Sequence, residues 1–339
     1  MATAISNVHN EVERQPGLLL EDARALFRAS GTESIHQEMF EAGGKLLRPR
    51  VLLLSVAHGE STGGIARWEL ARRAALAIEV AHVGTLYHDD IVDRSPIRRG
   101  ITAVHRRLGI RAASVGGAHL LSLGNAVFSC LPTHLVRRLG IAALREADGQ
   151  LQEIERTGRF DVTPQEYIRI ASKKTGSPFE LAAFVGASLG GAGASDRSLL
   201  SRFGRQFGVA YQLFDDLDDF VVTAALHRPP LNDLRERVYT LPVLLGCAQP
   251  GALGQQLREL LRDDGRPLEY ARATEVCELL RRGNAFEEAA NRAIDERESA
   301  RHWLELVSPS EPKESLGSLL ARLDHRVFEA PGRSDGVLT

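Results

Sequence analysis

The sequence predicts an all-α protein, and three observations support that prediction. Apolar residues recur at spacings of three and four along nearly all of the 339-residue chain, which is the period of a helix with one buried face. Alternating apolar and polar residues are scarce, and no Asn-Gly or Asp-Gly pair lies between β-branched runs, so strands are not expected. Breakers containing Gly and Pro separate the helical segments without a Pro/Ser-rich linker, so we expect a single domain.

Eight segments show the helical period most clearly, and Gly or Pro lies between consecutive ones. In chain order they are Leu18–Phe27, Leu70–His88, Ala112–Leu131, Leu139–Ile154, Phe179–Leu189, Leu199–Phe220, Ala271–Leu280 and Ala285–Val307. With shorter segments between them, they predict roughly a dozen helices in one domain over residues 1–339. The polar ends, about residues 1–15 and 329–339, are expected to be disordered.

The composition excludes several classes of function. Lys and Arg total 42 and Asp and Glu total 44, a net charge of −2, whereas nucleic-acid-binding domains usually carry a basic excess. Three cysteines lie far apart without a CxxC pair, which indicates a reducing compartment and argues against a cysteine-built zinc site. Neither a signal sequence nor a run of ~20 apolar residues is visible, so we expect a cytoplasmic protein without a stable membrane anchor.

Two acidic clusters interrupt the amphipathic pattern, each at the end of a long apolar helix. The first, HDDIVD, ends at Asp93, and the second, YQLFDDLDD, ends at Asp219. Asp89 and Asp93 are four residues apart and share a helix face, as do Asp215 and Asp219. Carboxylates stacked in this way repel one another unless a cation lies between them. Two such faces opposed across a cavity would offer oxygen ligands to Mg²⁺, with phosphate supplying the rest.

The alternative interpretation is that each cluster is a solvated helix end. A single DDxxD pattern would suit that interpretation, but two copies at matching positions favour a metal site. Calcium loops of the EF-hand type are excluded, because the required glycine and closing glutamate are missing.

Basic residues lie where a phosphate-binding site would need them. The segment GGKLLRP (residues 43–49) begins with a glycine pair, and an RRG triplet (residues 98–100) follows the first cluster. Backbone amides at glycine approach an anion closely, and arginine forks bind phosphate oxygens in pairs. The chain has only four lysines, so Lys45 in this segment and Lys174 stand out. Each motif alone is a weak signal, because surface loops of this composition are common.

Taken together, these segments resemble the trans-isoprenyl diphosphate synthases, the family of farnesyl, geranylgeranyl and longer polyprenyl diphosphate synthases. The resemblance runs from about residue 20 to 325 and rests on motifs in family order. They are GGKLLRPR (43–50), HVGTLYHDDIVD (82–93), RRG (98–100), DGQ (148–150), KTG (174–176), YQLFDDLDD (211–219) and YTLPVL (239–244). The resemblance implies an isoprenoid-synthase helical bundle around a central cavity, usually in a homodimer.

The resemblance also implies a reaction. Members of this family are transferases of isoprenoid biosynthesis that condense isopentenyl diphosphate head-to-tail with an allylic diphosphate. Three Mg²⁺ ions between the aspartate clusters grip the allylic diphosphate, which leaves to give a carbocation that the isopentenyl double bond attacks. Loss of a proton completes the addition of five carbons. The metal charge stabilises the leaving group, which is a Lewis-acid role.

Residue roles carry over from the family by position. The resemblance implies these catalytic residues: Asp89, Asp90, Asp93, Asp215, Asp216, Asp219 and Lys174. Within that set the metal ligands would be Asp89, Asp93, Asp215 and Asp219. The isopentenyl diphosphate pocket would consist of Gly44, Lys45, Arg48, His82 and Arg99. The allylic diphosphate would be held by Arg98, Lys174, Thr175, Gln212 and Arg228. His82 lies two helical turns before Asp89 on the same face, which favours a ligand role over that of a core histidine.

The chain departs from the family pattern at three positions. Where the family places two lysines after the second cluster, this chain has Arg228 and Val238, and Ala118 replaces a usual aspartate. We expect Arg228 to retain one charge and Arg235 or Arg237 to substitute for the other.

Product length follows from the residues four and five positions before the first aspartate. In the family these residues form the floor under the growing chain, and short-chain enzymes place aromatics there. Here they are Thr85 and Gly84, both small. The expected product is therefore C20 or longer, with the floor deeper, near Phe128 or Leu120.

Two alternatives of different class remain open. A class I terpene cyclase shares the fold and the metal chemistry but does not need GGKLLRP or RRG. A non-catalytic subunit of a two-component synthase tends to lose aspartates, and both clusters are complete here. The sequence therefore favours a chain-elongating trans-polyprenyl diphosphate synthase acting on isopentenyl and allylic diphosphates.

Overall fold

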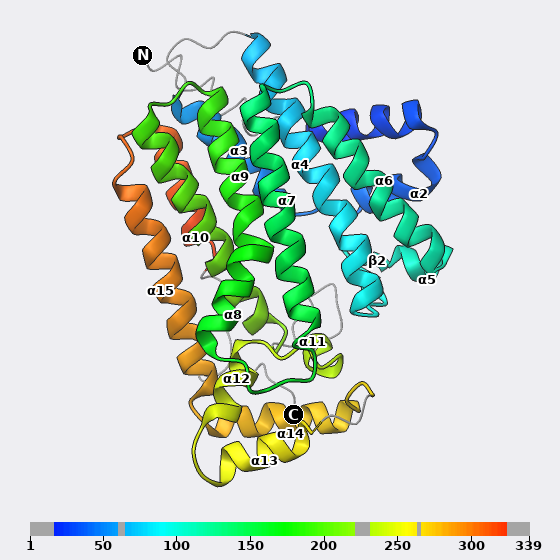
Figure 1. Cartoon of the computed structure of the whole chain (residues 1–339), viewed down its shortest axis with the longest axis vertical. Helices are drawn as coiled ribbons and strands as arrows, with labels where there is room; N and C mark the ends of the chain where they lie inside the picture. The colour runs from blue at the N-terminus through cyan, green and yellow to red at the C-terminus, as the bar shows by residue number, and fades with distance from the viewer. Residues whose placement is uncertain (1–16, 60–64, 221–230, 263–265, 324–339) are drawn as a thin grey trace. The chain divides into compact units, whose positions relative to one another are not determined.

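The computed structural model describes residues 17–59, 65–220, 231–262 and 266–323 (Figure 1). Arg228 and the two chain ends that we expected to be disordered lie outside these residues. Among the helices of the described part, none is long and apolar enough to cross a membrane.

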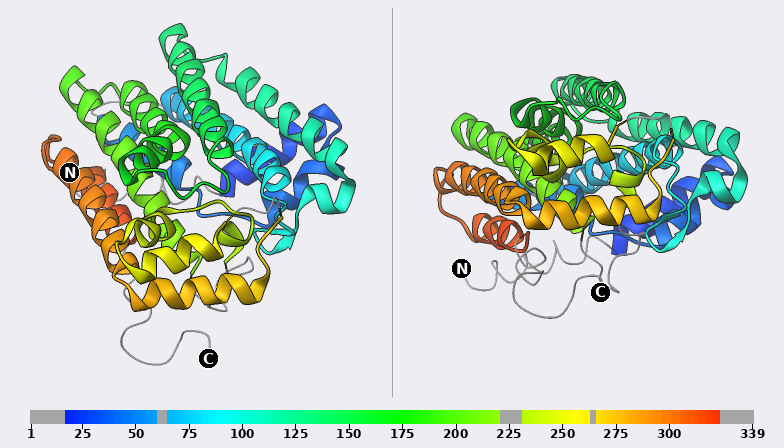
Figure 2. Two further views of the ribbon diagram at one scale, coloured as in Figure 1. Left: turned by 60° about the horizontal axis from the view of Figure 1, so that its bottom comes forward. Right: turned by 90° about the horizontal axis from the view of Figure 1, so that it is seen from below.

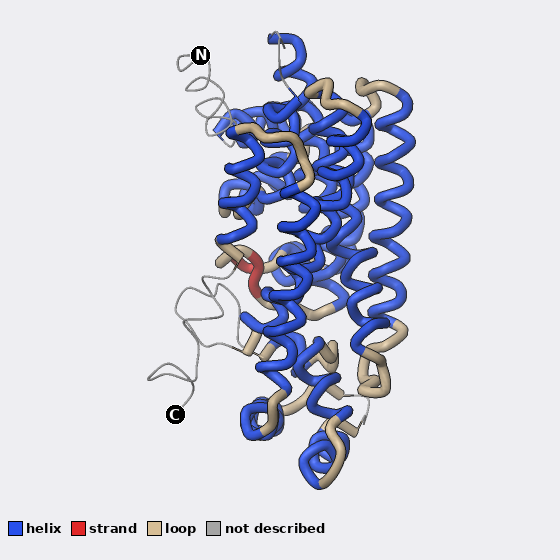
Figure 3. Tube along the Cα trace, turned by 90° about the vertical axis from the view of Figure 1, so that its left-hand side faces the viewer, coloured by secondary structure: helices blue, strands red, loops and turns tan. Residues whose placement is uncertain are grey.

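Helices make up most of the described residues, which confirms the all-α prediction (Figure 3). A first helix covers residues 17–30. The others are α2 (Glu33–Glu41), α3 (Leu47–Gly59), α4 (Ile65–Val92), α5 (Val104–Leu108), α6 (Ile110–Phe128), α7 (Thr133–Ile154), α8 (Pro164–Ala171), α9 (Ser177–Leu189), α10 (Ala194–Asp218), α11 (Asn232–Arg235), α12 (Leu241–Ala248), α13 (Ala252–Leu260), α14 (Tyr270–Arg282), α15 (Ala285–Glu305) and α16 (Glu311–Ala321). A π-helical turn, η1 (Ser172–Gly176), joins α8 to α9. Each of the eight predicted segments lies wholly or mostly within a helix.

One short hairpin was not expected from the sequence. Strands β1 (Ile97–Arg98) and β2 (Ile101–Thr102) pair antiparallel. The two residues of the turn, Arg99 and Gly100, both have positive φ, 53° and 79°. A two-residue turn of this kind usually contains Asn-Gly or Asp-Gly, so an arginine in the first position concealed it.

The chain divides into two compact units. Unit 1 consists of Met1–Ala142, Pro178–Gly204 and His302–Ser318, and unit 2 consists of Ala143–Ser177, Arg205–Arg301 and Leu319–Thr339. Unit 1 contains GGKLLRP, the first aspartate cluster and RRG. Unit 2 contains DGQ, KTG and the second cluster. A single domain over the whole chain stays a prediction.

Within unit 1, helices α4 and α6 lie side by side (Figure 1). They run antiparallel, because Gly117 of α6 lies beside Gly84 of α4 and Gly124 lies beside Ala77. A Cβ atom built at Gly84 would lie 2.8 Å from the carbonyl oxygen of Gly117. This close backbone contact fixes the helix that carries the first aspartate cluster.

Within unit 2, the aspartate end of α10 rests on a buried apolar cluster. The cluster draws Leu213, Phe214 and Leu217 from α10 and includes residues of α12 and α14. Helices α13 and α14 pack side by side (Figure 2). The apolar face of α10 therefore packs in the buried apolar cluster of unit 2. The second aspartate cluster lies at the end of the same helix.

Candidate active site

The first aspartate cluster begins with a buried ion pair. Asp90 is only 1% exposed, and Arg98 of β1 donates from Nε to Asp90 Oδ1 at 2.7 Å and from Nη2 to the same oxygen at 2.6 Å. Burial raises the pKa of Asp90 to about 6, and the charge of Arg98 opposes that rise. Asp90 Oδ2 is shielded from solvent without a hydrogen-bond partner. Asp90 thus joins the end of α4 to the RRG hairpin.

Asp89 and Asp93 lie on one turn at the end of α4. The backbone N–H of Asp93 donates to the carbonyl of Asp89 at 2.8 Å, so the helical spacing that we predicted holds across the cluster. Burial would lower the pKa of the Arg98 guanidinium, but Asp90, Asp89 and Asp93 together raise it. Arg98, expected on the allylic diphosphate, therefore lies among the carboxylates of the first cluster.

Arg99 links the RRG hairpin to the GGKLLRP segment. Its Nη2 donates to Glu79 Oε1 on α4 at 2.9 Å, and its Nη1 donates to the carbonyl of Met39 at 3.4 Å. A Cβ built at Gly44 would lie 2.9 Å from Arg99 Cζ, so glycine at 44 makes room for the guanidinium. Two residues predicted to share the isopentenyl diphosphate pocket are therefore in contact.

His82 lies among the arginines of the same unit. Burial lowers the pKa of His82 well below its usual range, and the charges of Arg48, Arg99 and Arg98 add to that effect. His82 Nδ1 and Arg48 Nε are both shielded from solvent without hydrogen-bond partners, while Arg48 Cζ lies 4.8 Å from the centre of the Phe179 ring. Lys45 is exposed. Unit 1 thus gathers most of the predicted pocket into one cationic site.

The second cluster contains a buried hydrogen-bond network. The Tyr167 hydroxyl of α8 donates to Asp216 Oδ2 at 2.5 Å, and Gln212 Nε2 donates to Asp216 Oδ1 at 2.9 Å. Thr175 Oγ1 donates to Gln212 Oε1 at 2.7 Å. Burial raises the pKa of Asp216 to about 8, against the two hydrogen bonds that it accepts. The network joins α8, η1 and α10.

Tyr167 belongs to this hydrogen-bond network but was not among the residues predicted from the sequence. It lies on the apolar face of a short amphipathic helix, where an aromatic side chain is usually core. The available signal was its position eight residues before Thr175 in the KTG motif.

Asp219 caps a helix. Its Oδ1 and Oδ2 accept the backbone N–H groups of Asn232 and Asp233 at 3.3 and 3.2 Å, at the start of α11. Its backbone carbonyl accepts the N–H of Leu231 at 2.9 Å. This capping role was not anticipated, and the metal-ligand role of Asp219 stays a prediction.

Lys174 lies on the π-helical turn η1, and its Nζ pairs with Glu153 Oε2 of α7. Helix α7 passes η1 at Gly149, where a Cβ would lie 2.7 Å from the backbone nitrogen of Lys174. The DGQ motif therefore serves close packing against the KTG motif. A π-helical turn of this kind is frequent at functional sites.

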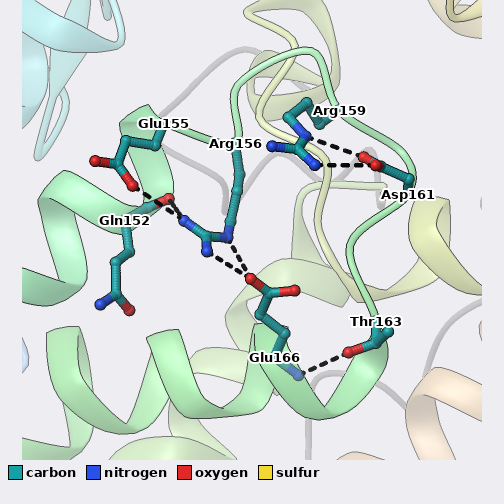
Figure 4. Close-up of polar contacts among 7 residues, drawn as sticks. All are labelled: Gln152, Glu155, Arg156, Arg159, Asp161, Thr163 and Glu166. Atoms are coloured by element: carbon teal, nitrogen blue, oxygen red, sulfur yellow. Dashed lines mark hydrogen bonds and ion pairs between the residues drawn. The ribbon is translucent and has the colours of Figure 1, made fainter.

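Ion pairs fix the connection from α7 to α8 (Figure 4). Arg156 donates through Nε and Nη2 to Glu166 Oε1 at 2.7 and 2.5 Å, and through Nη1 to the carbonyl of Gln152 at 2.9 Å. Thr163 Oγ1 accepts the backbone N–H of Glu166 at 3.2 Å, which caps α8. These contacts hold the start of the helix that carries Tyr167.

Arg237 and Arg235, the two residues expected to substitute for the missing lysine, make different contacts. Arg237 is 4% exposed, and its guanidinium donates to the carbonyls of Arg266, Leu261 and Arg262. These contacts give Arg237 a structural role, and its substitution for the missing lysine stays a prediction. Arg235 is half-buried, and its Nε has no hydrogen-bond partner.

The two chain-length residues face different surroundings. Gly84 lies against the backbone of α6, with Leu120 and Leu121 close by. Thr85 is half-buried, and its hydroxyl donates to the carbonyl of His82 at 2.8 Å. A small residue at 84 is thus required by helix packing, whatever its part in setting product length.

Comparisons with known proteins agree with this description. A family model described as polyprenyl synthetase matches residues 31–279. The chain belongs to the polyprenyl synthetase family. It is 30% identical over 283 residues to nonaprenyl diphosphate synthase of Mycobacterium tuberculosis, covering 83% of each chain. It is 37% identical over 213 residues to geranylgeranyl diphosphate synthase of Methanosarcina mazei, covering 61% of this chain and 64% of the relative.

A solved structure extends the likeness to the fold. Geranylgeranyl pyrophosphate synthase of Corynebacterium glutamicum, complexed with calcium and isoprenyl diphosphate, is 27% identical, covers 98% of each chain and has a TM-score of 0.73. The helical isoprenoid-synthase fold, the polyprenyl synthetase family and the prenyltransferase class that the sequence indicated are therefore confirmed.

Proposed function

We propose that the chain condenses isopentenyl diphosphate head-to-tail with an allylic diphosphate to give a trans-polyprenyl diphosphate of C20 or longer. The observation that carries this proposal is the cationic site of unit 1, where Arg99 lies against Gly44 and the charges of Arg48 and Arg99 reach His82. An enzyme that only ionises one allylic diphosphate has no need of a second anion site. The family match supports the same reaction class.

In this proposal the residues of unit 1 bind the diphosphate of isopentenyl diphosphate. Arg48 and Arg99 supply planar guanidinium forks that match phosphate oxygens, and Lys45 supplies a point charge. The lowered pKa of His82 keeps its imidazole neutral, so it can donate one N–H to an oxygen without adding charge. Gly44 leaves the space that Arg99 occupies.

The acidic residues fit divalent magnesium. Asp89, Asp93, Asp215 and Asp219 offer only carboxylate oxygens, which hard cations prefer, and Asp90 Oδ2 is a shielded oxygen without a partner. Among the described residues no three His, Cys, Asp or Glu side chains form a metal site by themselves. We therefore expect diphosphate and water to complete the coordination of three Mg²⁺ ions. Bound Mg²⁺ would neutralise the allylic diphosphate and stabilise it as a leaving group.

Most of the residues proposed to hold the allylic diphosphate belong to unit 2. Lys174 lies on η1, and Thr175 and Gln212 are joined by a hydrogen bond of 2.7 Å. Asp216 accepts hydrogen bonds from Gln212 and Tyr167 and so fixes the side chain of Gln212. Arg98 and Arg228 complete the set that the resemblance implied. The calcium and isoprenyl diphosphate bound in the Corynebacterium glutamicum enzyme support a diphosphate-and-cation site in this family.

We also propose a cytoplasmic homodimer. Four large apolar residues on α7 are exposed: Ile141 (40%), Leu144 (64%), Leu151 (60%) and Ile154 (42%). Their spacings of three, seven and three place them on one helix face. An exposed apolar stripe of this kind usually marks a protein–protein contact, and a second copy of the chain is the partner that we propose.

The decisive experiment incubates the purified protein with Mg²⁺, labelled isopentenyl diphosphate and allylic diphosphates of C5 to C20. Longer diphosphates would support the proposal. Hydrocarbon products would indicate a terpene cyclase instead, and activity only after adding a partner chain would indicate a non-catalytic subunit. A parallel reaction with EDTA should give no product, because the carboxylates need the divalent cation to hold diphosphate.

A further inference from the structure

Glu79 is a buried carboxylate in the middle of the apolar helix α4. Glu79 is 4% exposed, and its Oε1 accepts a hydrogen bond from Arg99 Nη2 at 2.9 Å. The side chain of Arg99 is only 14% exposed in this pair. A buried carboxylate is costly unless it is paired and hydrogen-bonded, so Glu79 and Arg99 depend on each other.

Arg99 is held in one orientation by three contacts. Glu79 accepts from Nη2, the carbonyl of Met39 accepts from Nη1, and the backbone at Gly44 lies against the guanidinium. The backbone of Arg99 is itself fixed in the left-handed region by the hairpin turn, with φ of 53°. A guanidinium has five N–H donors, so donors remain for a ligand after these contacts.

The position of Glu79 on α4 places it beside the proposed diphosphate site. It lies three residues before His82, so both side chains project from the same face of the helix. Arg99 reaches this face of α4 through Glu79, and the charges of Arg48, Arg99 and Arg98 add to burial in lowering the pKa of His82. A lone arginine among like charges would be pushed away from them, and the carboxylate of Glu79 opposes that repulsion.

We propose that Glu79 is a positioning residue that fixes the Arg99 guanidinium to receive the diphosphate of isopentenyl diphosphate. This inference rests on the proposed function. Glu79 acts through Arg99 rather than on the substrate, so its loss affects one substrate more than the other. Binding of isopentenyl diphosphate weakens, while the residues proposed to hold the allylic diphosphate are unchanged.

The test compares Glu79→Gln with Glu69→Gln. Glu69 also lies on α4 and pairs with Arg73 at 2.6 Å, but both side chains are about half exposed. In Glu79→Gln the KM for isopentenyl diphosphate should rise about tenfold, the scale of one charge-assisted hydrogen bond. The KM for the allylic diphosphate should stay within about twofold, and Glu69→Gln should leave both unchanged. An unchanged KM for isopentenyl diphosphate, or an equal rise in both KM values, would overturn the inference.

A double-mutant cycle supplies an independent readout. If Glu79 acts through Arg99, adding Glu79→Gln to Arg99→Gln should cause no further rise in the KM for isopentenyl diphosphate. Additive effects would show that the two residues act separately. Should Glu79→Gln fail to fold, Glu79→Asp keeps the charge on a shorter arm and should give an intermediate KM; a wild-type KM would contradict the inference.

Failure of the proposed function can be distinguished from failure of the positioning role of Glu79. A wild-type protein that incorporates no isopentenyl diphosphate would refute that function. Calorimetric titration of wild type and Glu79→Gln with inorganic pyrophosphate would still test the positioning role, since it measures the anion site directly. Equal affinity in the two proteins would refute it.

Discussion

Arg237 adopts a left-handed backbone conformation, with φ of 62°, that non-glycine residues rarely adopt. Its guanidinium donates to carbonyls of the segment between α13 and α14, and its Nη1 also donates to the Tyr239 hydroxyl at 3.3 Å. The backbone carbonyl of Arg237 accepts the N–H of Gly158 at 2.8 Å. The residue therefore links three segments of unit 2, and this explains its unusual conformation.

Arg237→Met should consequently destabilise the protein without changing substrate binding. The lost donors leave buried carbonyls unsatisfied, which should lower the free energy of unfolding by about 2–3 kcal/mol. Denaturant unfolding monitored by circular dichroism measures this change. Arg235→Met is the matched control and should cost less than about 1 kcal/mol, because Arg235 Nε has no partner to lose. A rise in the allylic KM of Arg237→Met at unchanged stability would contradict this assignment.

His36 should make the stability depend on pH. It is fully buried, and its ring nitrogens lie 3.3 Å from the Tyr87 hydroxyl and 3.2 Å from His119 Nδ1. Burial, with the nearby charge of His119, lowers the pKa of His36 to about 4. The unfolded chain takes up the proton near pH 6.5 and the folded chain only near pH 4. Stability is therefore lost as pH falls between these values, by up to about 3 kcal/mol.

The measurement is the free energy of unfolding of wild type and His36→Asn at pH 7.5 and pH 4.5. The variant should show a smaller loss between the two pH values. His134→Asn, which changes an exposed histidine at the start of α7, should keep the wild-type difference. Equal pH dependence in wild type and His36→Asn would show that His36 does not titrate as argued.

At the scale of elements, the contact between α4 and α6 allows the packing role of Gly84 to be tested separately from the chain-length role of Thr85. A Cβ at Gly84 meets the carbonyl of Gly117 at 2.8 Å, so Gly84→Ala should lower the free energy of unfolding by about 1–3 kcal/mol. Thr85→Phe changes a half-buried neighbour without that contact and should shorten the product by about one or two isoprene units. Chromatography of labelled products checks the lengths. Unchanged products in a folded Thr85→Phe variant would contradict the chain-length role of Thr85.

The long helices were predictable because their apolar period extends over many residues. Helix α4, the segment from Leu70 to His88 in the sequence, was correct in kind and close in bounds. The hairpin at Arg99 and the cap at Asp219 were not predictable, because both depend on contacts made after folding. Arg99 of the first contacts Glu79 of α4, and the N–H groups of Asn232 and Asp233 create the second.

The residues of the candidate site likewise fall into those that could be predicted from the sequence and those that could not. Residues named through the motifs, such as Gly44, Arg99 and His82, could be predicted because their spacing follows the family order. Glu79 was missed because a single polar group in an apolar helix has no periodic signal. Tyr167 was missed because an aromatic residue on the apolar face of an amphipathic helix is usually core. The structural contacts of Arg237 were not predictable, because charge alone does not reveal the carbonyls that a guanidinium will meet.

At the scale of the whole molecule, the exposed stripe of α7 predicts how the chain assembles. Leu144→Glu with Leu151→Glu places two charges on that stripe and should convert a dimer into a monomer, because charges are disfavoured at the centre of an interface. Sedimentation velocity measures the mass. Leu306→Glu, at a residue 53% exposed and not on α7, should leave the dimer intact. A dimer that survives the double substitution would place the contact elsewhere.

The ion pair between Asp90 and Arg98 also sets the charge balance at the end of α4. Because the Arg98 guanidinium donates to Asp90 from two nitrogens, the negative charge of Asp90 is balanced by a cation of the protein itself. Asp89 and Asp93 share a face at this helix end, where the macrodipole already disfavours negative charge. A divalent cation would offset that cost more fully than a monovalent one.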